Sequence, residues 1–145
     1  MTFDLDTALR EADEYEKSRE PIDAQVVIGK RVVTVRIPYL PGREFDDATA
    51  AHTYPFPYRD VLGCWFNLDA VTQNHPRIVL VNGKGAVVDD LTVVKDDESH
   101  YRWPEVYAAL STADKMTLQA VVWGVYIHDP EQRIADAKEA ARERV

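Results

Sequence analysis

The chain has 145 residues, of which 46% are hydrophobic and 29% charged, and its formal net charge is −8. This length fits one domain with its own core over residues 1–145, and the apolar content is too high for a disordered chain. Acidic side chains outnumber basic ones by 25 to 17, which disfavours sequence-independent binding to nucleic acid. The longest apolar run, 120–127, is too short to cross a bilayer, and the acidic start is unlike a secretory signal. We therefore expect a soluble, intracellular single domain.

The first segment has the pattern of an amphipathic helix. Apolar residues recur at helical spacing on one stripe, namely Leu5, Ala8, Leu9, Ala12 and Tyr15. Charged residues occupy the opposite face. Asp4 or Asp6 can cap the helix at its start, and Pro21 ends it.

A β-hairpin over residues 22–37 is the clearest local signal. Two runs rich in Val and Ile flank Gly29-Lys30, which fits a two-residue turn. This register places Asp23 opposite Arg36, a pair of opposite charges. The face expected to point inward holds Ile22, Ala24, Val26, Ile28, Val33, Val35 and Ile37.

The middle of the chain predicts shorter elements. The expected segments are a short helix at 43–52, an extended stretch at 53–58, a strand or buried helix at 61–66, and helical turns at 67–74. A second hairpin is indicated by Asn82-Gly83-Lys84-Gly85, between segments 77–81 and 86–94. The acidic run 96–98 is interpreted as a solvated loop.

The last third is expected to be helical, from about residue 104 to 144, and to pack on the apolar face of the strands. Pro104 fits the first turn of a helix, and Ser111 with Asp114 is a capping-box pattern. Trp123 and Tyr126 are expected in the core because valines and an isoleucine surround them. The predicted fold class is therefore α+β, with an N-terminal helix, one or two antiparallel hairpins and a helical C-terminal half.

A separate final helix is predicted at 131–144, with Asp129-Pro130 and Gln132 repeating the capping pattern. Its apolar stripe is mostly alanine: Ile134, Ala137, Ala141 and Val145. Alanine buries little surface, so we expect this helix to dock only marginally.

Residue types used in catalysis are present, but not in the spacing that catalysis or metal binding needs. The histidines at 52, 75, 100 and 128 form no His-x-x-x-His pair and are expected in solvated loops. Cys64 lies in an apolar run and is interpreted as a buried, inert thiol, which points weakly to a reducing cytoplasm. The acidic clusters at 46–47, 89–90 and 96–98 are interpreted as solvated charge. We expect no catalytic residue, cofactor or metal, with a small His/carboxylate enzyme as a third class of function.

Three aromatic residues, Tyr54, Phe56 and Tyr58, alternate with prolines in a stiff, extended segment. Such a segment loses little conformational entropy on binding, so these rings are the candidate partner-binding residues. The alternative is that they cover the core.

The order of segments along the chain resembles a known family. The matching segments are the acidic helix at 2–12, the hairpin at 28–37, then 41–45, 67–71, 103–110, 118–124 and 129–135. Together they resemble the tail assembly chaperones of long-tailed (siphovirus) phages of actinobacteria, encoded just upstream of the tape measure protein. The resemblance covers nearly the whole chain and depends on segment order and a few Trp, Pro and Arg positions.

The resemblance implies a non-catalytic protein that binds the tape measure protein and keeps it soluble during tail assembly. It implies action in the host cytoplasm and absence from the mature virion, without binding to nucleic acid or membrane. A frameshift-extended form would recruit the tail-tube protein. Self-association stays open. The alternative function is a virion structural or adaptor protein, such as a head–tail completion or minor tail component.

Overall fold

The computed structural model describes residues 3–53 and 64–143. The chain is α+β, with an N-terminal helix, antiparallel strands in a four-stranded and a two-stranded sheet, and a helical C-terminal region. This architecture confirms the predicted fold class.

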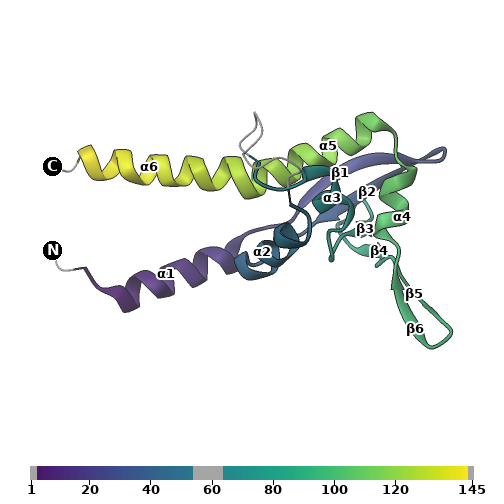
Figure 1. The fold of residues 1–145 in the computed structure, drawn as a ribbon, viewed down its shortest axis with the longest axis horizontal. Coiled ribbons are helices and arrows are strands. Elements are labelled where there is room, and N and C mark those ends of the chain that lie inside the picture. The colour runs from purple at the N-terminus through teal and green to yellow at the C-terminus, as the bar shows by residue number, and fades with distance from the viewer. Residues whose placement is uncertain (1–2, 54–63, 144–145) are drawn as a thin grey trace.

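The helices are α1 (Leu5–Ser18), α2 (Gly42–Ala51), α3 (Leu68–Gln73), α4 (Trp103–Ala109), α5 (Thr112–Trp123) and α6 (Asp129–Glu143), with a π-helical turn η1 (Gly124–His128) between the last two. The strands are β1 (Ile22–Ile28), β2 (Arg31–Ile37), β3 (Val79–Val81), β4 (Val87–Asp89), β5 (Thr92–Lys95) and β6 (Glu98–Tyr101). The larger sheet has the order β1-β2-β3-β4, and β5 pairs with β6 alone. The strands and α2 to α5 form a body, from which α1 and α6 extend on one side (Figure 1).

The first hairpin has the predicted register. Val26 pairs with Val33 and Asp23 with Arg36, and Gly29 takes the positive φ of 64° that the turn requires. Val26 and its diagonal neighbour Val35 are almost completely buried, so the predicted apolar face does point inward.

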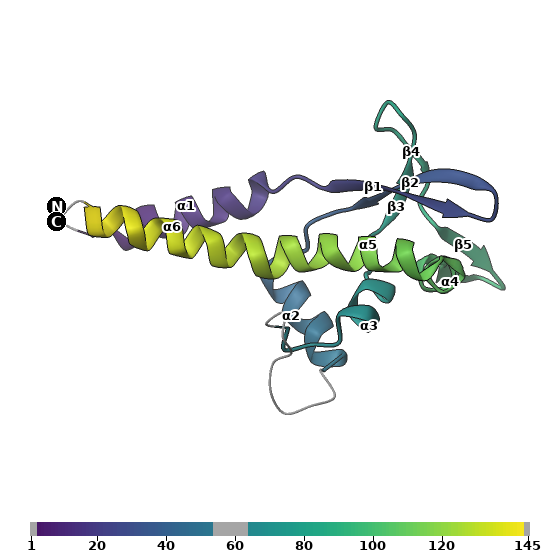
Figure 2. The ribbon, with the colours of Figure 1, turned by 90° about the horizontal axis from the view of Figure 1, so that it is seen from above.

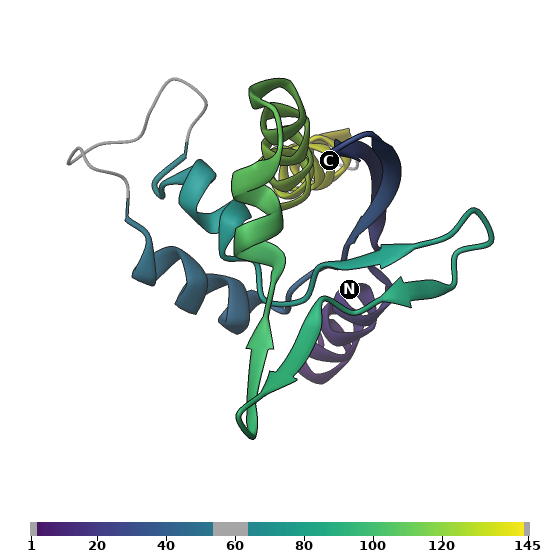
Figure 3. The ribbon, with the colours of Figure 1, turned by 90° about the vertical axis from the view of Figure 1, so that its right-hand side faces the viewer.

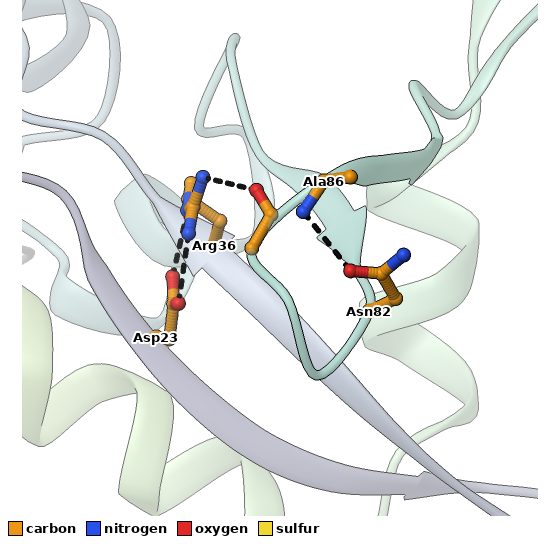
Figure 4. Close-up of polar contacts among 5 residues, drawn as sticks. Asp23, Arg36, Asn82 and Ala86 are labelled. Carbon is orange, nitrogen blue, oxygen red and sulfur yellow. Dashed lines mark hydrogen bonds and ion pairs between the residues drawn. The ribbon is translucent and has the colours of Figure 1, made fainter.

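Arg36 connects this hairpin to the second one. Its guanidinium binds the Asp23 carboxylate through two hydrogen bonds of 2.8 and 3.0 Å, and donates a third, of 3.1 Å, to the carbonyl of Gly85 (Figure 4). Within the second turn, the Asn82 side chain accepts a hydrogen bond of 3.0 Å from the Ala86 N–H. One guanidinium therefore holds β1, β2 and the β3–β4 turn together, and it keeps the pKa of Asp23 below its ordinary value.

Two clusters of buried side chains make up the core. The sheet-side cluster contains Val26, Val35, Ile37, Ile78, Leu91, Trp103, Tyr107, Leu110 and Leu118. The second cluster contains Leu40, Phe45, Cys64, Phe66, Val71, Val122, Val125, Tyr126 and Ile127. Helix α5 joins them, because Leu118 belongs to the first, Val122 to the second, and Val121 packs against both.

The segment 86–94 is not one strand, because β4 and β5 are separate elements within it, whereas the predicted acidic loop is confirmed as an exposed turn at Asp96 and Asp97, with Glu98 beginning β6. Strand β4 ends at Asp89, and the chain turns at Leu91, which has a φ of +61° and is buried. β5 and β6 then form a third hairpin, with Asp96 and Asp97 at positive φ in its turn. Figure 3 shows this hairpin projecting from the body. Aspartate tolerates the left-handed conformation without glycine, so the turn carried no glycine signal.

The predicted break before the last helix is also wrong. α5, η1 and α6 run without interruption, and Asp129-Pro130 lies inside this long helix. Proline has no N–H to donate and its ring crowds the carbonyl four residues earlier. The wider turn of η1, in which the Asp129 N–H donates to the Gly124 carbonyl, precedes Pro130 and relieves this conflict.

Helix α6 extends from the body and contains no buried residue, which agrees with the expected marginal docking (Figure 2). Among the described residues of the helical C-terminal part, the buried side chains come from α4, α5, η1 and from Leu110, which lies between α4 and α5.

Deleting residues 136–145 is therefore expected to leave the fold cooperative. The deletion removes the exposed outer part of α6, including a hydrogen bond of 3.0 Å between Gln132 and Asp136, a class of contact worth only about 0.2–0.5 kcal/mol. Thermal unfolding followed by circular dichroism should keep one transition, with its midpoint within a few degrees of the full chain. Loss of the transition would show that α6 is part of the core.

Candidate partner-binding surface

The three aromatic residues predicted from the sequence to bind a partner, Tyr54, Phe56 and Tyr58, lie outside the described residues. Their role stays a prediction. The neighbouring Cys64 is fully buried in the second cluster, as expected for a structural thiol. The surface considered below comes instead from α1 and α6.

The histidines are placed differently from one another. His100 and His128 are exposed and His52 is half-buried, but His75 is only 2% exposed, so its predicted place in a solvated loop is wrong. His75 lies in the connection between α3, which ends at Gln73, and β3, which begins at Val79. In residues 3–53 and 64–143, no three His, Cys, Asp or Glu side chains are placed to hold a metal ion.

Helices α1 and α6 run antiparallel and form an arm whose free end holds both chain ends of Figure 1. We call these two helices the arm. Asp4 caps α1 by accepting hydrogen bonds from the N–H groups of Asp6 and Thr7, so the helix begins where the sequence predicts. Neither helix contains a buried residue.

Arg19 attaches the arm to the body. Its guanidinium donates to the Tyr15 hydroxyl at 3.0 Å and to the Val125 carbonyl at 3.4 Å, and lies 4.6 Å from the centre of the Tyr39 ring. The Asp129 carboxylate lies 4.0 Å away. One side chain therefore contacts α1, the segment after β2, η1 and the start of α6.

Tyr39 extends the contacts of Arg19 into the second cluster. We call Arg19 and Tyr39 together the joint. Its ring stacks on Tyr126 at a centroid distance of 5.4 Å, and Tyr126 stacks in turn on Phe45. Burial, followed by a hydrogen bond to Glu16 of α1, raises the pKa of Tyr39 to about 12. The Tyr39 hydroxyl thus stays protonated at neutral pH and links the end of α1 to the core.

Beyond the joint, a cation–π contact connects the two helices. The guanidinium carbon of Arg133 in α6 lies 3.6 Å from the centre of the Tyr15 ring, a cation–π contact. This contact joins the C-terminal half of α1 to α6.

The large apolar side chains of the arm are exposed. Leu5 and Leu9 of α1 are each 58% exposed, and Ile134 of α6 is 54% exposed. The apolar stripe that the sequence predicts for α1 is therefore uncovered along its outer part. An exposed apolar stripe with polar borders is typical of a surface that binds a partner.

The arm is also acidic. Residues 3–20 carry seven acidic and three basic side chains, and α6 carries five acidic and three basic ones.

A separate apolar hollow of about 270 Å³ lies between α3 and α5, lined by Leu68, Met116, Gln119, Ala120 and Trp123. None of the described helices is long and apolar enough to cross a membrane.

Comparison with known proteins found no match: no family model matches the chain, and neither a curated protein nor a solved structure matches it.

The buried His75 predicts how stability depends on pH. Burial lowers its pKa from 6.5 to about 4, so between these values the unfolded chain binds a proton that the folded chain does not. The free energy of unfolding should therefore fall as the pH drops from 6.5 to 4, by about 3 kcal/mol in total.

Denaturant unfolding measured across this pH range should show a smaller pH slope for His75→Gln than for the wild type. His100→Gln is the matched control, because His100 is exposed and should leave the slope unchanged. If the free energy of unfolding has the same pH slope in His75→Gln and in the wild type, His75 is not the cause of the pH dependence.

Proposed function

We propose that this protein is a phage tail assembly chaperone that binds the tape measure protein and keeps it soluble until the tail tube forms around it. The proposal is supported by the order of sequence segments, which resembles that family, and by the exposed apolar stripes of the arm. The proposed action is stoichiometric binding, in the host cytoplasm, by a protein that leaves before the virion is complete.

The observation that carries the proposal is the exposure of Leu5, Leu9 and Ile134 on helices without a buried residue. A body with two core clusters does not need these side chains for its own stability. Burying each large aliphatic side chain against a partner would contribute about 1.5–3 kcal/mol. The arm is therefore better explained as a contact surface than as part of the fold.

The charge of the chain fits the same function. A tape measure protein is a long helical chain with apolar faces, which aggregates when those faces are exposed. A coat of bound chains, each with a net charge of −8, would make the complexes repel one another. Apolar contact on one side and negative charge elsewhere are the two properties that a solubilising partner needs.

Co-expression tests this function. The tape measure protein encoded beside this chain should be insoluble when expressed alone and soluble when expressed with the chain, and the two should co-purify without added nucleotide or metal. An unrelated acidic protein of similar size is the control for charge alone.

Two results would contradict the proposal. One is a tape measure protein that stays insoluble in the presence of this chain at equal expression. The other is recovery of the chain from purified virions in fixed stoichiometry, which would favour a structural or adaptor protein of the particle.

A further inference from the structure

The turn between β3 and β4 contains an asparagine followed by a glycine, Asn82-Gly83, and both residues are exposed. Main-chain hydrogen bonds close this turn: the Asn82 N–H donates to the Ala86 carbonyl at 2.9 Å, and the Gly85 N–H donates to the Asn82 carbonyl at 3.0 Å. The side-chain oxygen of Asn82 accepts two more, from the N–H groups of Lys84 at 2.9 Å and of Ala86 at 3.0 Å (Figure 4). The side-chain amide of Asn82 is therefore held against the main chain that follows it.

This arrangement exposes the Asn82 amide to attack by the backbone nitrogen of Gly83, a reaction that closes a five-membered succinimide ring. Gly83 has no Cβ to crowd the approach. In the described part of the chain, its N–H donates no hydrogen bond that the attack would break. The two donors to the Asn82 side-chain oxygen point at the atom on which negative charge develops, as in an oxyanion hole. The turn therefore combines an accessible nucleophile with an activated carbonyl carbon.

The other two asparagines of the sequence, Asn67 and Asn74, do not combine these features. Asn67 caps α3 and is followed by a leucine, whose side chain crowds the backbone nitrogen. Asn74 is followed by His75, whose N–H already donates to the Thr72 carbonyl at 3.4 Å. Both are therefore internal controls for a reaction at Asn82.

We propose that Asn82 is a site of spontaneous deamidation, a modification that does not depend on the proposed function. The Gly83 nitrogen loses its proton to a base in solution and bonds to the Cγ atom of Asn82. The tetrahedral intermediate then breaks its bond from Cγ to Nδ2, and ammonia leaves with a proton taken from water. The product of this step is the succinimide.

Water then opens the succinimide ring in one of two ways. Cleavage of the bond from nitrogen to Cγ leaves an aspartate. Cleavage of the bond from nitrogen to the main-chain carbonyl carbon leaves an isoaspartate, in which the chain continues through the former side chain. Water is the co-reactant of both routes, and the protein gains one negative charge.

The isoaspartate changes the contact between the two hairpins. It adds one carbon to the main chain between Asn82 and Gly85, and the Gly85 carbonyl accepts the hydrogen bond of 3.1 Å from Arg36 (Figure 4). The closed turn cannot absorb this added length without moving that carbonyl. The isoaspartyl product therefore detaches the turn from Arg36, which keeps its two hydrogen bonds to Asp23.

The test incubates the full chain in neutral and in mildly alkaline buffer and follows tryptic peptides by mass spectrometry. Peptide 78–84 contains Asn82 as its one asparagine, and peptide 60–77 contains both internal controls. Peptide 78–84 should gain about 1 Da and separate into two products, whereas peptide 60–77 should stay unchanged. The rate should rise with pH, because base removes the proton from the Gly83 nitrogen.

Gly83→Ala is the decisive variant. The φ of Gly83 lies outside the left-handed region, and a Cβ there would meet no atom beyond its chain neighbours within 4 Å, so the fold accommodates alanine. The added Cβ should slow the mass gain by about tenfold or more. Lys84→Ala is the matched control, because it keeps the Asn82-Gly83 pair and both main-chain donors, and it should react like the wild type.

Thermal unfolding tests the consequence for the turn. After incubation, the unfolding midpoint of the wild type should fall by roughly a few degrees relative to fresh protein, whereas Gly83→Ala should keep its midpoint. An unchanged midpoint in a wild-type sample rich in isoaspartate would show that the turn stays attached to Arg36.

Three results would overturn the assignment of Asn82 as the modification site. They are a peptide 78–84 that gains no mass, equal rates in the wild type and Gly83→Ala, and a reaction that occurs in the urea-unfolded chain but not in the folded one. The last result would show that the native turn blocks the attack.

Discussion

The position of the arm depends on Arg19. This side chain leaves the chain one residue after α1 ends, yet it reaches Tyr15 behind it, Tyr39 after the first hairpin, and the Val125 carbonyl in η1. It is mostly buried, so its charge is satisfied by hydrogen bonds, aromatic faces and the nearby Asp129 carboxylate rather than by water. Arg19 therefore joins the end of α1 to the second cluster and to the start of α6.

The joint connects two parts of the molecule, the body and the arm, which are stabilised in different ways. In the body, strands and helices bury their apolar faces in two clusters that meet along α5. In the arm, two amphipathic helices have only a polar and aromatic connection to that core. An arm of this kind is positioned by the body, while the body gains little stability from it. Such a division suits a protein whose exposed helices must stay available to a partner.

Local signals in the sequence predicted much of the fold. The first hairpin was predictable because alternation, turn length and the Asp23–Arg36 pair all specify one register. The Ser111 cap was predicted as well, but Asp114 does not close a capping box and instead accepts a hydrogen bond of 2.9 Å from the Val27 N–H. Two features were missed. The helix continues through Pro130 because a π-turn precedes the proline, and the β5–β6 hairpin was not predicted because aspartate adopts the left-handed conformation of its turn without glycine.

The candidate site was only partly predictable. The apolar stripe of α1 was evident from its spacing, and the weak docking of α6 followed from its alanines. The pairing of α1 with α6 in one arm was not evident from the sequence, because it depends on contacts between residues more than 100 positions apart, such as Arg19 with Val125 and Tyr15 with Arg133. No short sequence window contains that information. The role of the aromatic run at 54–58 stays a prediction from sequence.

Amide hydrogen exchange is the most direct measurement of whether the arm is the binding surface. In the free chain, amides of α1 and α6 should exchange quickly, because neither helix is covered, while β1, β2 and α5 should be protected. In complex with the tape measure protein, protection should rise along α1 and α6 and change little in the β5–β6 hairpin. Unchanged exchange in the arm, with new protection confined to the body, would contradict the account.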